Sequence, residues 1–434
     1  MSTNEPLAIS ESQQMNLDTE PEGRWKGAFR EMLAGGPGVA IGALILAFLV
    51  GSIMIAFTNA AVREAASYFF ARPQDFFSAL GSAMGGAYSS LIRGSIFNWE
   101  APTFQRMISP LLLTLHNSGP LICAGLGVAV TFKAGLFNIG GRGQMLMAAV
   151  FAGWLAFGLP NLPVGIHLIV CILGGILGGA LWGALAGFLN AKTGAHEVIA
   201  TIMLNYVALY LLQYLLATPG LMQNPGSSNP ITPATPMSAQ LPRLFGRQFP
   251  LNAGFLIALL AVAFCWWLLN RSSLGFAFKA VGENKRAAKV AGINTDRMTI
   301  TVFAISGALL ALAGAMQVLG TVTTGFTDGI DGGIGFDGIT VALLGGSQPV
   351  GVLFAGLLFG AFKAGGSMMQ AGQMIPIEIV SVIQSLIVLF IAAPPLVRAI
   401  FHLPQPSQVA AAKKAAAKAA KAEAKAAAKK EVSA

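Results

Sequence analysis

The polar side chains best placed to act on a small molecule lie in a glycine-rich stretch between two apolar runs. This first stretch, KAGLFNIGGRGQ, spans residues 133–144 and carries Asn138, Arg142 and Gln144. Another amide, Asn205, lies inside a later apolar run. Amides both donate and accept hydrogen bonds, so these residues are candidates for contacting a polar solute. The alternative is that they form hydrogen bonds between neighbouring helices, as isolated polar residues in apolar segments often do.

A second glycine-rich stretch, GFTDGIDGGIGFDGITVALLGG, spans residues 325–346 and contains Phe336 and Asp337. Each stretch directly follows an apolar segment, at equivalent points in the two halves of the chain. Paired interruptions of this kind are typical of transport sites in membrane proteins built from inverted repeats. Irregular backbone at membrane depth persists only where it lines water or is buried in protein. The alternative is that both stretches are ordinary glycine-rich surface turns.

Motifs for covalent chemistry are missing from the chain. It has no G-x-x-x-x-G-K-[ST] phosphate loop, no nucleophile elbow and no paired metal-ligand spacing, and it contains only four histidines. Its three cysteines lie in apolar segments and are expected to be small core residues. Acids within apolar segments are scarce, whereas ion-coupled carriers usually need one. We therefore expect no metal, no cofactor and no catalytic residues, and an energy source outside this chain.

A basic island at residues 271–297 separates two uncharged apolar segments. Within it, residues 284–291 are predicted to form a short helix, with Asn284 capping its start and Gly292 ending it in a left-handed conformation. So short a helix is unstable alone and must pack against something. It is either part of a solvated basic loop or a helix that fits a cleft on a cytoplasmic partner.

The composition predicts the elements that position these residues. The chain is 55% hydrophobic and only 10% charged, which is typical of a polytopic membrane protein and not of a soluble domain. We predict an all-α polytopic membrane protein of about ten transmembrane segments, with two glycine-broken helices in inverted-repeat-like halves. Residues 58–106 are expected to be a long loop with an interfacial portion at 76–91. The predicted segments are 39–57, 108–132, 143–159, 164–189, 198–217, 251–269, 298–319, the short 338–346, 350–369 and 377–393.

Charge patterning predicts the topology. Lysine and arginine accumulate on the cytoplasmic side of membrane proteins, so the island and both termini are placed in the cytoplasm and residues 219–250 outside. The predicted parts are a cytoplasmic N-terminal segment (1–36), a transmembrane domain (37–397) in contact with membrane lipid, and an Ala/Lys-rich cytoplasmic tail (398–434). The net charge of +9 reflects this island and tail. Because no aromatic residues interleave the basic runs, we expect no nucleic-acid binding.

Four segments together resemble the permease subunits of bacterial ABC importers of the ribose/branched-chain amino-acid type. They are GLFNIGGRGQ (135–144), HEVIATIMLNYVALYL (196–211), AVGENKRAAKVAGI (280–293) and FDGITVALLGG (336–346). The branch that the chain is most similar to is that of the nucleoside, or simple sugar, permeases. The resemblance runs from about residue 39 to residue 395. It departs from the family at Arg142, where many relatives carry glutamate.

The resemblance implies a location in the bacterial plasma membrane and a set of partners. These are ABC ATP-binding subunits, a second permease subunit that is usually a different chain, and an extracytoplasmic substrate-binding protein or lipoprotein. ATP is then used by the partner, and this chain needs no cofactor of its own. The resemblance favours the docking-helix interpretation of the island, because residues 282–292 match the family's coupling motif. The matching residues are Gly282, Glu283, Asn284, Ala287, Ala288 and Gly292.

From these observations we predict a permease that moves nucleosides or related simple sugars by alternating access. Aromatic rings would stack on the base of the solute, and amides would bind its polar groups. The rival functions are an ion-coupled secondary transporter of a small polar solute, an intramembrane enzyme and a scaffold. The predicted solute-pathway residues are Phe132, Phe137, Asn138, Arg142, Gln144, Asn205, Phe336 and Asp337.

Overall fold

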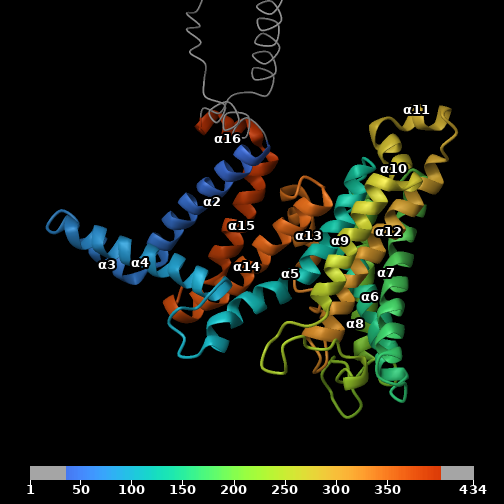
Figure 1. The fold of residues 1–434 in the computed structure, drawn as a ribbon, viewed down its shortest axis with the longest axis horizontal. Helices are drawn as coiled ribbons and strands as arrows, with labels where there is room; N and C mark the ends of the chain where they lie inside the picture. The colour runs from blue at the N-terminus through green and yellow to red at the C-terminus, as the bar shows by residue number, and fades with distance from the viewer. Residues whose placement is uncertain (1–35, 402–434) are drawn as a thin grey trace, which may run out of the picture. The chain divides into compact units, whose positions relative to one another are not determined.

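The computed structural model describes residues 36–401, and within that range the regular structure is helical, with no β-strand. The predicted N-terminal segment (1–36) and tail (398–434) therefore lie outside the described residues, except at their inner edges. The helices are shown in Figure 1. They are α2 (Gly36–Thr58), α3 (Ala60–Ser67), α4 (Pro73–Ser95), α5 (Phe104–Lys133), α6 (Gly141–Gly158), α7 (Ile166–Thr193), α8 (Glu197–Ala217), α9 (Gly254–Arg271), α10 (Ser273–Glu283), α11 (Lys285–Val290), α12 (Thr295–Met316), α13 (Ile334–Leu344), α14 (Pro349–Gln373), α15 (Ile377–Ala392) and α16 (Pro394–Phe401), with a 3-10 turn at Met237–Ala239 and a π-helical turn at Gln317–Thr321.

Seven of these helices are long and apolar enough to cross a membrane within the described range, namely α2, α5, α7, α8, α9, α12 with its π-helical turn, and α14. Each coincides with a predicted segment, so the chain is a multi-pass membrane protein. An eighth span arises if α15 and α16 are taken as one. The count of ten stays a prediction, because α6 does not meet the same test and α13 has only 11 residues. Eleven residues of helix rise only about 16 Å, half the hydrocarbon thickness.

The prediction of a long loop at residues 58–106 is wrong, because α3 and α4 occupy most of it. Asn59 starts α3, its side-chain oxygen accepting from the backbone N–H groups of Ala61 and Val62. Helix α4 packs on α14 through small residues: a Cβ at Gly365 would lie 2.3 Å from the carbonyl oxygen of Leu91. Small residues let membrane helices approach closely, so α4 is a packed helix and not a loop. The interfacial position of residues 76–91 stays a prediction.

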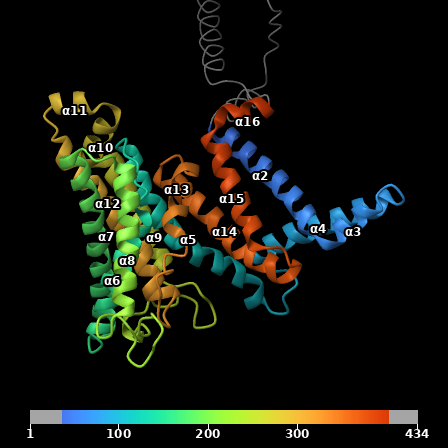
Figure 2. The same cartoon turned by 180° about the vertical axis from the view of Figure 1, so that it is seen from behind.

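Glycine packing also builds the main helix bundle, in which α7 and α12 run side by side (Figures 1 and 2). A Cβ at Gly183 would lie 2.2 Å from the carbonyl oxygen of Phe303, and one at Gly307 equally close to that of Gly179. Helix α5 passes through the core, where every residue from Ser118 to Thr131 is buried. The exposed face of α7 is formed by aliphatic side chains at every fourth position, namely Ile169, Leu173, Leu177 and Leu181. Such an apolar face suits contact with lipid.

The chain divides into two compact units. Of the described residues, the smaller contains 36–44 and 393–401. In it the start of α2 packs on α16, where a Cβ at Gly42 would lie 2.7 Å from Cγ1 of Val397. The larger unit, Ile45–Ala392, holds all the residues discussed below.

Candidate functional site

The first glycine-rich stretch leaves the helical path between α5 and α6, and Asn138 at its centre is fully buried. The Nδ2 atom of Asn138 donates to Gln144 Oε1 at 3.1 Å and to Ser306 Oγ of α12 at 2.8 Å. Its Oδ1 atom accepts from the backbone N–H of Gly140 at 2.9 Å. Asn138 therefore joins the irregular segment to α6 and α12.

Asn205 of α8 supports the same segment from the other side. Its Oδ1 accepts from the N–H of Gly143 at 2.8 Å, and its Nδ2 donates to the carbonyl of Ile139 at 2.9 Å. A break in a helix frees backbone groups that must be paired where no water reaches them. Asn138 and Asn205 perform this pairing, and Gln144 holds the side-chain amide of Asn138. The alternative of structural hydrogen bonds therefore describes all three amides, and we remove them from the proposed solute pathway.

The two glycine-rich stretches meet in the structure. A Cβ at Gly335 would lie 2.5 Å from the backbone nitrogen of Arg142, and one at Gly141 would lie 2.6 Å from the carbonyl oxygen of Gly335. An ion pair spans the same contact, with Arg142 Nε 3.2 Å from Asp331 Oδ1. Arg142 thus has a partner within the chain. The sequence reasoning overlooked Asp331, although an acid in one stretch and an arginine in the other are complementary in charge.

The predicted stacking residues lie elsewhere. The rings of Phe132 and Phe137 contact each other at the end of α5, with centroids 4.8 Å apart. Phe336 is exposed on α13. None of the three lines the cavity that contains Asp337, whose aromatic wall is instead formed by Phe359 and Phe362 of α14.

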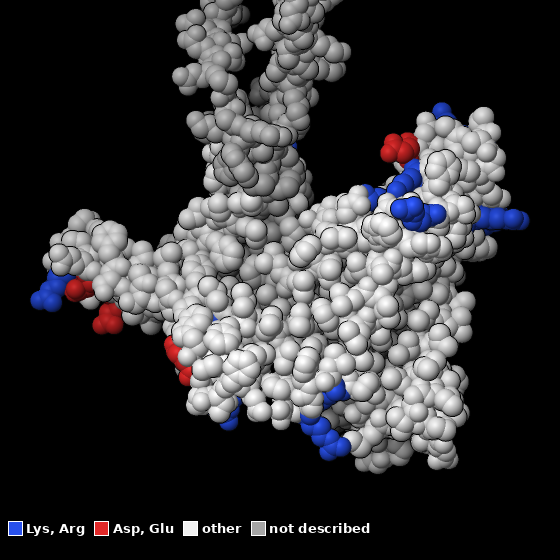
Figure 3. All heavy atoms as spheres, viewed as in Figure 1, with Lys and Arg blue, Asp and Glu red and all other residues white. Residues whose placement is uncertain are grey.

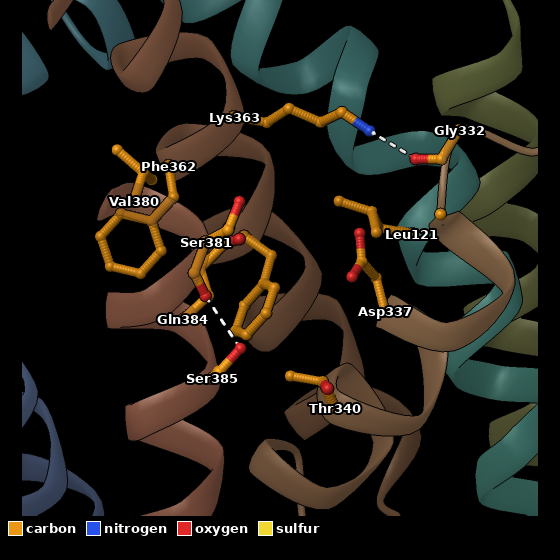
Figure 4. A pocket seen from close by; sticks show the side chains of 12 residues that line it. Leu121, Gly332, Asp337, Thr340, Phe362, Lys363, Val380, Ser381, Gln384 and Ser385 are labelled. Atoms are coloured by element: carbon orange, nitrogen blue, oxygen red, sulfur yellow. Dashed lines mark hydrogen bonds between the residues drawn. The ribbon is translucent and has the colours of Figure 1, made fainter. Parts of the chain in front are cut away.

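That cavity has a volume of about 340 Å³ and lies between α5, α13, α14 and α15 (Figure 4). Asp337, predicted from sequence, is one of its residues, and its carboxylate points into the space. The other polar residues were missed, although a lone lysine in an apolar span is itself a signal of function. The polar residues of the cavity are Asp337 and Thr340 of α13, Lys363 of α14, and Ser381, Gln384 and Ser385 of α15.

The two charged groups of the cavity differ in their partners. Lys363 Nζ donates to the carbonyl of Gly332 at 3.5 Å, from across the cavity (Figure 4). Among the described residues the carboxylate of Asp337 makes no hydrogen bond and no ion pair within 4.0 Å. A partly buried acceptor without a donor needs an explanation, and a ligand that enters the cavity would supply the missing donor.

The basic island folds as predicted around a short helix. The side-chain oxygen of Asn284 accepts from the N–H groups of Arg286 and Ala287 at 3.0 Å each and caps α11. Gly292 follows the helix with φ of +84°. Ala288 is the exception among the predicted coupling residues, since it is buried against its own chain. Val290, which the sequence reasoning missed, is 89% exposed.

The island also contacts the first glycine-rich stretch. A Cβ at Gly282 would lie 2.6 Å from the carbonyl oxygen of Lys133 and 3.0 Å from the backbone nitrogen of Gly135. The end of α10 therefore rests directly on the end of α5. Figure 3 shows lysine and arginine atoms around α10 and α11 and a largely uncharged surface below them. The basic island therefore touches the chain a few residues before Asn138.

Residues 111–392, more than half of the chain and including the whole cavity, match the family described as "Branched-chain amino acid transport system / permease component". The chain belongs to this permease family. The permease is similar to a guanosine ABC transporter permease protein of Bacillus subtilis, with 37% identity over 64% of this chain and 80% of that protein.

Two further relatives bear other names. A nucleoside ABC transporter permease protein of Lactococcus lactis is 34% identical over 64% of this permease and 78% of its own length. A glucose ABC transporter permease protein of Haloferax volcanii is 36% identical over 64% and 74%, respectively. No solved structure matches the permease.

Proposed function

We propose that this permease is the membrane subunit of an ABC importer that moves nucleosides or related simple sugars across the bacterial plasma membrane by alternating access. Membership of the permease family supports the transport role, and the names of the relatives support the solute class. The chain itself contributes no ATP site and no catalytic group in this proposal. ATP hydrolysis belongs to partner subunits.

The observation that carries the proposal is the polar cavity enclosed by apolar helices. Its volume of about 340 Å³ lies within the range of small-molecule sites, about 300–1,000 Å³. Polar side chains from three helices converge on it, and burying them costs free energy that core packing alone does not require. The irregular backbone at residues 325–333 adjoins it through Gly332 and Gly333. A solute path explains both features.

The proposed topology keeps ten membrane segments, by adding α6, α13 and α15 to the long apolar helices. In it the two irregular stretches are the broken halves of an inverted repeat, and their contact at Gly141 and Gly335 supports that pairing. The basic island and both termini are cytoplasmic, which agrees with the positive-inside rule.

Coupling to ATP is assigned to α11. In this proposal its exposed face, with Ala287 and Val290, fits a cleft on an ATP-binding subunit, and Asn284 and Gly292 fix its two ends. Gly282 passes the movement to the end of α5, through its close contact with Lys133. A second permease subunit completes the pore, and an extracytoplasmic substrate-binding protein or lipoprotein delivers the solute.

Reconstitution with its partners tests the proposal. The permease, its second subunit and the ATP-binding subunits are placed in proteoliposomes with the binding protein, and uptake of radiolabelled nucleoside, glucose and leucine is measured with and without ATP. We expect ATP-dependent uptake of nucleoside or sugar. Uptake that requires an ion gradient and no ATP-binding subunit would instead establish the secondary carrier. ATP-dependent uptake of leucine alone would change the solute class.

A further inference from the structure

The carboxylate of Asp337 differs from the other acid of the same stretch. Asp331 is 95% buried and fully engaged: Oδ1 pairs with Arg142, and Oδ2 accepts from the N–H of Gly333 at 3.2 Å. Asp337, six residues later on α13, has neither kind of partner among residues 36–401. Its carboxylate faces open space in Figure 4. The fold therefore pairs the carboxylate of Asp331 within the chain and leaves that of Asp337 available to a ligand.

The rest of the cavity wall restricts what that ligand is. A carboxylate only accepts hydrogen bonds, so the ligand atoms beside Asp337 must be donors. Lys363, more than 4.0 Å away, presents a donor from another side, and Thr340 and Gln384 can both donate and accept. One carboxylate and one ammonium leave the cavity without net charge. A phosphate group would meet the negative charge of Asp337, so a neutral ligand with several hydroxyl groups fits best.

We propose that Asp337 is the solute-recognition residue of this cavity and accepts hydrogen bonds from two adjacent hydroxyl groups, so that the cavity selects a vicinal diol. This inference rests on the proposed function and deepens it. Adjacent hydroxyls are the feature that the ribose of a nucleoside shares with a simple sugar. The two oxygens of one carboxylate accept from two neighbouring hydroxyls in a bidentate arrangement, in which each hydrogen bond is charge-assisted.

Protection of an introduced thiol tests the diol without the binding protein, which has its own preferences. Ser385, on the cavity wall, is replaced in S385C, and alkylation of this cysteine is followed in the permease bound to its ATP-binding subunits. The native Cys123, Cys171 and Cys265 are buried, so their background reactivity is low. We expect adenosine to slow the alkylation and 2′,3′-dideoxyadenosine to need a concentration at least about tenfold higher, which corresponds to about 1.4 kcal/mol for the lost hydrogen bonds.

A second substitution assigns the effect to Asp337. In S385C with Asp337→Asn, adenosine and its dideoxy analogue should protect equally weakly, because the charged acceptor is gone. Glu378→Gln is the matched control, since Glu378 is an exposed acid at the start of α15 that does not line the cavity. It should leave the tenfold preference for the diol intact. Size-exclusion chromatography of each variant reports whether the complex still assembles.

Three outcomes overturn the inference. Equal protection by adenosine and dideoxyadenosine in the S385C protein would show that the cavity does not recognise the two hydroxyl groups. An undiminished preference for adenosine over dideoxyadenosine after Asp337→Asn would show that Asp337 does not recognise the solute. Protection by leucine and not by adenosine makes the cavity a zwitterion site, with Asp337 facing the amino group and Lys363 the carboxylate. ATP-driven nucleoside uptake is measured separately. If uptake is intact but the cavity shows no preference for the diol, the inference fails and the proposed function stands. If uptake is absent but the diol still protects the cysteine, only the proposed function is rejected.

Discussion

The two glycine-rich stretches have similar composition and equivalent places in the chain, yet they are built for opposite purposes. Around residues 138–144 the side chains of Asn138, Gln144 and Asn205 are all hydrogen-bonded within the chain, and Asn138 and Asn205 also pair freed backbone groups. Around residues 331–337 the chain satisfies Asp331 and leaves Asp337 open to a cavity. The comparison indicates that a helix break becomes a ligand site only where a polar group is left without a hydrogen-bond partner in its own chain.

The contact between the two stretches is the place where a substitution should have the largest effect. Arg142→Met removes the partner of Asp331, a carboxylate that is 95% buried. Leaving one charge of a buried pair alone typically costs about 3–5 kcal/mol. We expect a marked loss of thermal stability in detergent, measured by the unfolding midpoint of the purified permease.

The double variant Arg142→Met/Asp331→Asn is the control for that prediction, because it removes both charges. It should recover a large part of the lost stability. If Arg142→Met alone keeps the parental unfolding midpoint, the ion pair does not hold the two stretches together, and the comparison between them loses its structural basis.

A smaller effect on stability is expected from Asn138→Ala. The substitution leaves the N–H of Gly140 and the hydroxyl of Ser306 without their partner in the core. A buried group left unsatisfied costs about 1–3 kcal/mol. The yield of assembled complex and its unfolding midpoint should both fall, and uptake should fall in proportion to the yield.

Solute contact by Asn138 would give another pattern. Uptake per assembled complex would then drop while the unfolding midpoint stayed at the parental value. That result would return the first stretch to the solute pathway and make the two stretches alike.

Much of this organisation was predictable, and the exceptions have physical causes. Apolar runs near 20 residues located the long helices, and Asn284 with Gly292 located α11, because span length and helix capping are local properties. Helix α4 was missed because its packing depends on small residues that meet α14 nearly 300 positions later in the chain. Likewise, no local pattern shows that Asn138 donates a hydrogen bond to Ser306, while the carboxylate of Asp337 has no hydrogen bond or ion pair in the part of the chain that the structure describes. Pairing between distant segments decides whether a polar residue is structural or functional.

The first stretch is also the one whose start, at Lys133 and Gly135, contacts the basic island through Gly282. Gly282→Ala places a Cβ 2.6 Å from the carbonyl oxygen of Lys133, and this backbone contact must open. We expect solute-stimulated ATPase activity of the assembled complex to fall severalfold, with little change in membrane insertion.

Gly292 offers a matched pair for the same experiment. Nothing lies within 4 Å of a Cβ built there, so only its left-handed backbone is demanding. Asparagine tolerates that conformation and valine does not. Gly292→Asn should therefore keep most of the stimulation, and Gly292→Val should lose it. Equal activity of the two variants would show that the end of α11 does not need its left-handed turn for coupling.

The smallest expected effect on stability belongs to the residue with the largest expected effect on solute binding. Asp337→Asn preserves the shape of the side chain and breaks no hydrogen bond or ion pair within the described residues. Removing an unpaired carboxylate from membrane depth relieves its desolvation penalty, so the unfolding midpoint should stay the same or rise slightly. Lys363→Met is the companion variant, because it removes the opposite charge from the same cavity. A fall in stability of Asp337→Asn comparable to that of Asn138→Ala would mean that Asp337 has a structural partner after all, and the two stretches would then differ only in which residues close them.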